Sequence, residues 1–183
     1  MRARIQNITD HLCAEGCTGR MKYMNITIKK METEEEIKGK AYVHWRCWQE
    51  TYPGFVSPEY LEKLTLQKCE ETAFQWPDNI LVAKEEGRVI GFVGYGSSRE
   101  DPGGAGEIFA LYTLPEFHGK GIGRRLMEAG LEQLKEYSLF RLWVVKGNER
   151  AIRFYEKFGF SPDGSEKFVQ SVGATGIRMT MKR

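Results

Sequence analysis

Residues 107–127 read EIFALYTLPEFHGKGIGRRLM, and this stretch decides the fold. An apolar run typical of a β-strand ends at Pro115, and a loop with alternating glycines follows at residues 118–123. Arg124 and Arg125 then open an amphipathic stretch typical of a helix. Glycine allows close approach of the backbone to a ligand, and N–H groups at a helix start attract anions. The stretch therefore predicts a site for a diphosphate.

The spacing of the glycines distinguishes this loop from two common nucleotide-binding loops. Gly119, Gly121 and Gly123 give Gly-x-Gly-x-Gly. A P-loop requires Gly-x-x-x-x-Gly-Lys-Ser/Thr, and a dinucleotide fingerprint requires Gly-x-Gly-x-x-Gly. Lys120 and the two arginines add positive charge nearby. The spacing fits neither nucleotide loop, and a plain glycine-rich turn is the alternative that the loop alone leaves open.

The rest of the chain predicts one α/β domain, since 183 residues can bury a core of their own. Thr33 to Glu36 matches a capping box, Asn148 is a typical N-cap, and Gly159 is a typical residue after a helix end. The order favours hairpins with two strand–helix units, hence a central mixed, mostly antiparallel, twisted sheet flanked by helices. Strands are expected at residues 25–30, 80–84, 88–97, 107–113, 141–145, 168–172 and 177–181, and helices at 33–52, 57–64, 65–76, 119–137 and 148–159.

Composition excludes several classes of protein. Basic residues number 27 and acidic residues 25, so the net charge of +2 gives no general case for binding nucleic acid. No apolar run approaches the ~20 residues that span a membrane, and the first twenty residues lack the apolar core of a secretion signal. We therefore expect a cytoplasmic protein. Residues 1–24 are expected to be a loose extension or to follow a start assigned too early, and residues 25–183 form the domain.

Four scattered cysteines are expected to be free thiols, and no metal site is predicted. Cys13 and Cys17 could form half of a metal site, but no second half follows and the chain has three histidines. Free thiols are typical of a reducing compartment. The other two cysteines are Cys47 and Cys69.

Two segments resemble motifs of one known family. Residues 111–123, LYTLPEFHGKGIG, resemble the acetyl-CoA motif of the GNAT superfamily of N-acetyltransferases. A second match follows in register: the strand at 142–145, then Asn148, then AIRFYEKFGF at residues 151–160. The resemblance covers residues 80–160 well and residues 25–60 loosely. It implies the GNAT fold, acetyl-CoA as cosubstrate and transfer of an acetyl group to a primary amine, and it allows a homodimer.

The resemblance also implies which residues hold the cofactor. Pantetheine is expected between the strand at 107–113 and the strand at 141–145, with the pyrophosphate on the glycine loop. His118 stands where the family usually has Arg or Gln, so we expect somewhat weaker and pH-dependent cofactor binding. The cofactor residues implied are Leu111, Tyr112, Thr113, His118, Gly119, Lys120, Gly121, Ile122, Gly123, Arg124, Asn148 and Phe154.

The same comparison implies the chemistry. Tyr155 is placed as the general acid that protonates the leaving thiolate, with a core aromatic as the alternative. Glu107 is placed as the general base, with a solvated carboxylate as the equal alternative. Glu50, His44 or water are other bases. Acceptor contacts are expected from His44, Trp48 and Tyr52, which could instead be core residues.

No Ser-His-Asp or Cys-His arrangement is suggested, so direct attack on acetyl-CoA in a ternary complex is predicted rather than a covalent acyl-enzyme. The amine belongs to a small molecule or a peptide. Two further interpretations stay open: a regulatory module that binds acyl-CoA without catalysis, and a protein N-terminal or lysine acetyltransferase.

Overall fold

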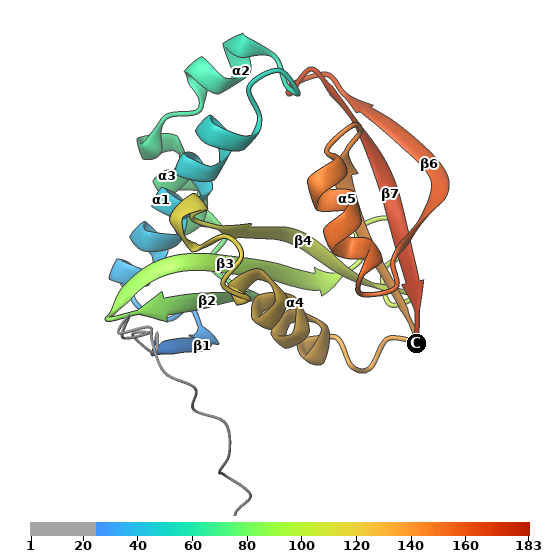
Figure 1. The fold of residues 1–183 in the computed structure, drawn as a ribbon, viewed down its shortest axis with the longest axis horizontal. Coiled ribbons are helices and arrows are strands. Elements are labelled where there is room, and N and C mark those ends of the chain that lie inside the picture. The colour runs from blue at the N-terminus through green and yellow to red at the C-terminus, as the bar shows by residue number, and fades with distance from the viewer. Residues whose placement is uncertain (1–24) are drawn as a thin grey trace, which may run out of the picture.

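A computed structural model describes residues 25–183, which form a mixed sheet with helices on both faces (Figure 1). The sheet order is β1-β2-β3-β4-β5-β7-β6, and every neighbouring pair is antiparallel except β4 and β5. This confirms the predicted fold class. The extension expected at residues 1–24, with Cys13 and Cys17, lies outside the described residues. The strands are β1 Ile26–Lys30, β2 Ile80–Glu85, β3 Arg88–Ser97, β4 Gly106–Thr113, β5 Leu139–Val145, β6 Ser161–Val169 and β7 Ala174–Lys182.

Local sequence signals explain where most helices begin. Thr33 and Glu36 form the predicted capping box of α1. The side chains of Ser57, Thr65 and Asn148 cap α2, α3 and α5, respectively. The helices are α1 Glu34–Thr51, α2 Pro58–Lys63, α3 Leu66–Gln75, α4 Ile122–Gln133 and α5 Glu149–Glu156, with a short 3₁₀ turn at Pro115–Phe117.

Gly159 ends the α5 segment as predicted. Its φ is 94°, in the left-handed region that glycine tolerates. The N–H of Gly159 donates to the Glu156 carbonyl, and the N–H of Phe160 donates to the Tyr155 carbonyl. These are the two hydrogen bonds of a Schellman motif, which satisfies carbonyls that a helix end leaves free. The motif fixes the direction in which the chain leaves Tyr155.

Glu36 anchors the start of α1 against the sheet. Its carboxylate is buried and lies 2.7 Å from the Lys84 ammonium and 3.0 Å from that of Lys29. Burial alone would raise the pKa of Glu36, but hydrogen bonds from Lys84, from the backbone N–H of Glu32 and from Lys29 lower it to about 2. The carboxylate is thus a structural anion at neutral pH.

Helix α4 and strand β6 differ most from the sequence expectation. Helix α4 begins at Ile122 instead of residue 119, because Gly119 and Gly121 have left-handed φ values of 76° and 77°. It ends at Gln133 instead of residue 137. Strand β6 begins at Ser161 instead of residue 168; it is exposed over most of its length, and its register with β7 shifts between Pro162 and Glu166. An exposed strand has no alternating apolar pattern to reveal it.

Helices α1 and α4 cover opposite faces of β3. The ring of Phe92 contacts His44 of α1, whereas the side chain of the next residue, Val93, lies against Gly130 of α4. Successive side chains of a strand point to opposite faces, so the two helices must lie on either side of the sheet. The core between the layers is apolar, and its largest fully buried side chains include Ile90, Phe92, Leu126, Met127, Phe140 and Leu142.

The sheet opens in its middle. Strands β4 and β5 pair over three positions, from Gly106 with Phe140 to Ile108 with Leu142, and then diverge. Beyond this point β4 stays paired with β3, and β5 with β7. At the other end of the opening, the Ser57 N–H donates to the Val172 carbonyl at 2.9 Å and links the segment before α2 to the β6–β7 turn (Figure 1). The β4–β5 pairing thus bounds one end of the opening, and the Ser57–Val172 hydrogen bond joins the chain segments at the other.

Within residues 25–183, none of the helices combines the length and the apolar character that crossing a membrane requires.

Candidate active site

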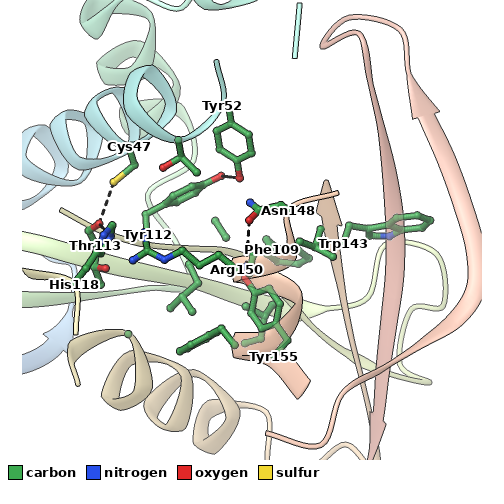
Figure 2. A pocket seen from close by; sticks show the side chains of 18 residues that line it. Cys47, Tyr52, Phe109, Tyr112, Thr113, His118, Trp143, Asn148, Arg150 and Tyr155 are labelled. Atoms are coloured by element: carbon green, nitrogen blue, oxygen red, sulfur yellow. Dashed lines mark hydrogen bonds between the residues drawn. The ribbon is translucent and has the colours of Figure 1, made fainter. Parts of the chain in front are cut away.

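A cavity of about 200 Å³ lies where β4 and β5 diverge (Figure 2). Strand β4 contributes residues 108–113, β5 contributes Trp143 and Val144, and the end of α1 and the first turns of α5 complete the wall. Among the predicted site residues, those that line the cavity are Tyr52, Leu111, Tyr112, Thr113, His118, Gly123, Asn148, Phe154 and Tyr155.

The glycine loop borders the cavity at Gly123 and is shaped by two left-handed residues. A Cβ added to Gly119 or Gly121 would meet no atom within 4 Å, so this face of the loop is open. Gly121 caps α4 without any side-chain hydrogen bond, which leaves the first N–H groups of the helix free for a ligand. The loop can therefore offer backbone donors and the positive end of a helix to an anion.

The cationic side chains near the loop have different partners. The Arg124 guanidinium is exposed and lies 2.7 Å from the Glu128 carboxylate, and Lys120 lies over the Phe117 ring. Arg125 donates to the Ile26 carbonyl at 2.9 Å and so ties α4 to β1. Arg125 is thus a structural residue, whereas Lys120 and Arg124 remain predicted cofactor contacts.

The free edge of β4 faces the opening. The Leu114 N–H donates to the Ile90 carbonyl of β3, so by alternation the backbone groups of Leu111 and Thr113 point away from β3. The Thr113 carbonyl is 3.3 Å from the Cys47 sulfur and 3.0 Å from Nε2 of His118. Burial, and then the nearby Arg150 cation, lower the pKa of His118. A neutral His118 donates from Nε2 to this carbonyl.

Helix α5 contributes the two residues that the sequence motif singled out. Asn148 is buried, and its Oδ1 accepts a hydrogen bond from the Ala151 N–H at 3.1 Å. Tyr155 points into the cavity from the next turns of the helix (Figure 2). Burial, and then the proximity of Tyr52, raise the pKa of the Tyr155 phenol, so it stays protonated at neutral pH. A protonated phenol beside the cavity can serve as a proton donor.

The side chains of His44, Trp48, Tyr52, Phe92 and Tyr112 form an aromatic cluster between α1 and the sheet. Tyr52 and Tyr112 line the cavity, whereas His44 and Trp48 lie behind them. The Trp48 indole N–H donates to the Tyr112 hydroxyl at 3.0 Å, and the Tyr52 and Tyr112 hydroxyls are 3.4 Å apart. The structure thus brings one of the three expected acceptor residues, Tyr52, directly to the cavity.

None of the three candidate base side chains lines the cavity. Glu107 is buried, and its carboxylate accepts a hydrogen bond from the Arg99 N–H at 3.2 Å. Glu50 is ion-paired with Arg46. Burial, and then the nearby Lys40 cation, lower the pKa of His44 to about 4, which makes its imidazole a weak base. Their role as general base stays a prediction.

The cavity lining also includes residues that the sequence reasoning did not propose, among them Cys47, Phe109, Trp143 and Arg150. Arg150 projects across the cavity from the first turn of α5 (Figure 2). Its position two residues after the Asn148 cap was the available signal, because a side chain in the first turn can reach the ligand at the helix start. Burial raises the pKa of the Cys47 thiol to about 12, so this cysteine is a poor nucleophile.

Cys47 and Cys69 are free thiols, as predicted for these two residues. In the described part of the chain, no group of three or more His, Cys, Asp or Glu side chains is arranged to hold a metal ion.

Comparison with known proteins identifies a family. The protein-family model with the description "Acetyltransferase (GNAT) family" matches residues 41–160 of this chain. The uncharacterized N-acetyltransferase YuaI of Bacillus subtilis is 33% identical over 146 residues, 75% of this chain and 80% of that protein. A mycothiol acetyltransferase of Propionibacterium freudenreichii is 39% identical over 88 residues, which are 46% of this chain and 28% of that enzyme.

Solved structures share the fold. The PaiA N-acetyltransferase of Thermoplasma acidophilum in complex with coenzyme A has a TM-score of 0.68 and 26% identity, covering 87% of this chain and 100% of that one. The ribosomal-protein-alanine N-acetyltransferase of Brucella melitensis has a TM-score of 0.67 over 86% of this chain and 99% of that one. At 23% identity, the second likeness concerns the fold alone.

Proposed function

The chain belongs to the GNAT acetyltransferase family, and on that premise we propose that it transfers the acetyl group of acetyl-CoA to a primary amine of a small molecule or peptide. The observation that carries the proposal is the cavity between β4 and β5. It is bordered by a backbone anion site, by a free strand edge and by a protonated phenol. These are the three groups that a thioester donor with a pyrophosphate needs.

The groups proposed to bind acetyl-CoA are mainly backbone groups. The glycine loop and the start of α4 would hold the pyrophosphate, with Lys120 and Arg124 adding charge. The pantetheine amides would hydrogen-bond along the edge of β4 at Leu111 and Thr113. Because the Leu111 N–H points toward the opening, it is the donor that we assign to the thioester oxygen as negative charge develops on it.

The proton steps use one side chain and solvent. Tyr155 would hydrogen-bond the sulfur of coenzyme A and protonate the thiolate as the carbon–sulfur bond breaks; its raised pKa keeps the phenol protonated at neutral pH until negative charge develops on the sulfur. An amine of pKa near 10 must lose a proton before it attacks. Since Glu107, Glu50 and His44 lie outside the cavity lining, we assign this proton to water. The amine nitrogen then attacks the thioester carbon directly, without an acyl-enzyme. As the carbon–sulfur bond breaks, the nitrogen loses its second proton to water, and water returns a proton to Tyr155.

The proposal is tested by release of free coenzyme A thiol from acetyl-CoA in the presence of an amine. The amine panel contains polyamines, aminoglycosides, amino acids and peptides with free N-termini, with mass spectrometry of the acetylated product. Thiol release that depends on one class of amine is the expected result. Tight acetyl-CoA binding with no acetylated product across the panel would instead favour a regulatory module that binds acyl-CoA.

A further inference from the structure

The aromatic cluster contains a chain of hydrogen bonds that runs from Trp48, outside the cavity lining, to two tyrosines that line the cavity. An indole N–H can only donate, so the Tyr112 oxygen must be the acceptor in its 3.0 Å contact with Trp48. The Tyr112 hydroxyl can also donate a hydrogen bond of its own. The Tyr112 and Tyr52 hydroxyls are 3.4 Å apart, and either can donate to the other. Donation by Tyr112 gives its proton an acceptor, and it sets the direction Trp48 to Tyr112 to Tyr52 with the Tyr52 proton facing the cavity.

Packing holds the members of this chain in place. The Trp48 and Tyr52 rings lie 4.5 Å apart between centroids, and the Tyr112 ring contacts His44 at 5.6 Å and Phe92 at 5.5 Å. Rings fixed in this way cannot turn their hydroxyl groups away without disturbing the layer between α1 and the sheet. Hydrogen bonds in a chain polarise one another, so donation by Trp48 strengthens the next bond.

Tyr52 is the member that can meet the acceptor. It lines the cavity with Tyr155, and it is close enough to contribute to the raised pKa of the Tyr155 phenol. The loop that follows Tyr52 is held by the bond from Ser57 to Val172, which fixes this wall of the cavity. A hydroxyl of defined direction at this point can orient an amine toward the thioester.

We propose that Trp48 and Tyr112 are positioning residues that fix the direction of the Tyr52 hydroxyl, which contacts the acceptor in the cavity. This inference rests on the proposed function for its kinetic consequence, but the hydrogen-bonded chain itself is a property of the free protein. Trp48 therefore acts on the acceptor through two hydroxyls, without lining the cavity.

The chain is tested first by NMR, which needs no activity. In protein carrying ¹³Cζ-labelled tyrosine, the Tyr52 and Tyr112 signals are assigned from Tyr52→Phe and Tyr112→Phe. Trp48→Phe removes the indole N–H and is expected to shift both signals, whereas Tyr112→Phe shifts that of Tyr52. A Trp48→Phe spectrum in which Tyr112 moves and Tyr52 does not would overturn the proposed direction.

Kinetics with the amine found by thiol release form the second test. Trp48→Phe and Tyr112→Phe are each expected to lower kcat/KM for the amine by about 10-fold, the size of one hydrogen bond, with the Kd for acetyl-CoA unchanged. The double variant is expected to be no worse than either single one, since both break the same chain. Additive losses, or equal losses in acetyl-CoA affinity, would contradict the proposal.

The matched control is Trp45→Phe, which makes the same change three residues earlier on α1. Trp45 packs against Tyr42 and the small cluster of Ala41, Cys69 and Ala73, away from Tyr112. The Trp45→Phe variant is expected to leave the tyrosine chemical shifts and kcat/KM unchanged. If the wild-type protein acetylates no amine, the proposed function fails, and the NMR shifts still decide whether the chain exists.

Discussion

The glycine loop and the aromatic cluster are two walls of the same cavity, built in opposite ways. The loop is backbone from residues 118–123, and its shape comes from two left-handed glycines within one short segment. The cluster is made of side chains, and its hydrogen bonds join residues 60 and 64 positions apart. A wall of backbone is specified locally by residue type and spacing. A wall of side chains exists only once distant elements have packed.

The largest effect is expected on acetyl-CoA binding, from a substitution in the glycine loop. Gly121→Val forces a β-branched residue into a left-handed conformation and places a Cβ on the open face of the loop, so we expect acetyl-CoA binding to be abolished. Isothermal titration calorimetry measures the loss. Gly103→Val is the matched control, because Gly103 has a φ of 81° with equally open surroundings outside the cavity lining. Retained binding in Gly121→Val would remove the loop from the cofactor site.

The next effect concerns the phenol of Tyr155, which reaches the same cavity from α5. Tyr155→Phe removes the proposed proton donor and is expected to lower kcat by roughly 10- to 1000-fold, with little change in acetyl-CoA affinity. Steady-state kinetics and calorimetry separate the two quantities. Tyr137→Phe, at a ring that packs near Gly106, controls for the loss of a hydroxyl elsewhere. Turnover equal to that of the wild type would exclude Tyr155 from the mechanism.

The aromatic cluster should also contribute a pH-dependent stability through His44. The pKa of His44 is lowered to about 4 in the folded state, against about 6.5 when unfolded, so the unfolded chain binds the proton first as pH falls. The free energy of unfolding is expected to decrease by roughly 2 kcal/mol between pH 6.5 and pH 4, after a discount for partial exposure. Urea unfolding of the wild type and of His44→Phe measures this contribution, which the variant should lose.

The smallest effect is expected at His118, the first residue of the glycine loop. Its pKa is lowered in the free protein, and a bound phosphate would favour the protonated ring, so affinity for acetyl-CoA should rise a few-fold as pH falls from about 8 to 6. His118→Gln should bind slightly more tightly at pH 8 and show no such slope. Identical slopes for the two proteins would mean that His118 does not meet a phosphate.

Local signals predicted most of the fold. The cap at Thr33, the cap at Asn148 and the glycine at 159 each act within a few residues, so helix positions could be predicted from neighbouring residues. The start of β6 could not, because an exposed strand with a shifted register gives no periodic signal. The predicted start of α4 was early because the alternating glycines interrupt the helix instead of opening it.

The candidate site was predictable to the extent that it follows a motif. Asn148, Tyr155 and residues 108–113 of β4 line the cavity, while their roles in binding and catalysis stay predictions. Arg150 and Trp143 were missed because their role depends on the divergence of β4 from β5, which no local pattern signals. Trp48 was expected to touch the acceptor, but its position behind Tyr112 is set by how α1 packs on the sheet.

The three-position contact between β4 and β5 leaves an unfinished sheet inside the molecule. Strand edges normally occur at the outside of a sheet, whereas this one is internal and is proposed to be completed by the pantetheine arm. The cosubstrate then becomes part of the architecture, and the free energy of binding adds to the free energy of unfolding. At roughly 100 times its Kd, a ligand adds about 2.7 kcal/mol. When the acetyl-CoA concentration in a cell falls, the free energy of unfolding of this protein would therefore fall as well. The abundance of the protein would then follow the metabolic state of the cell.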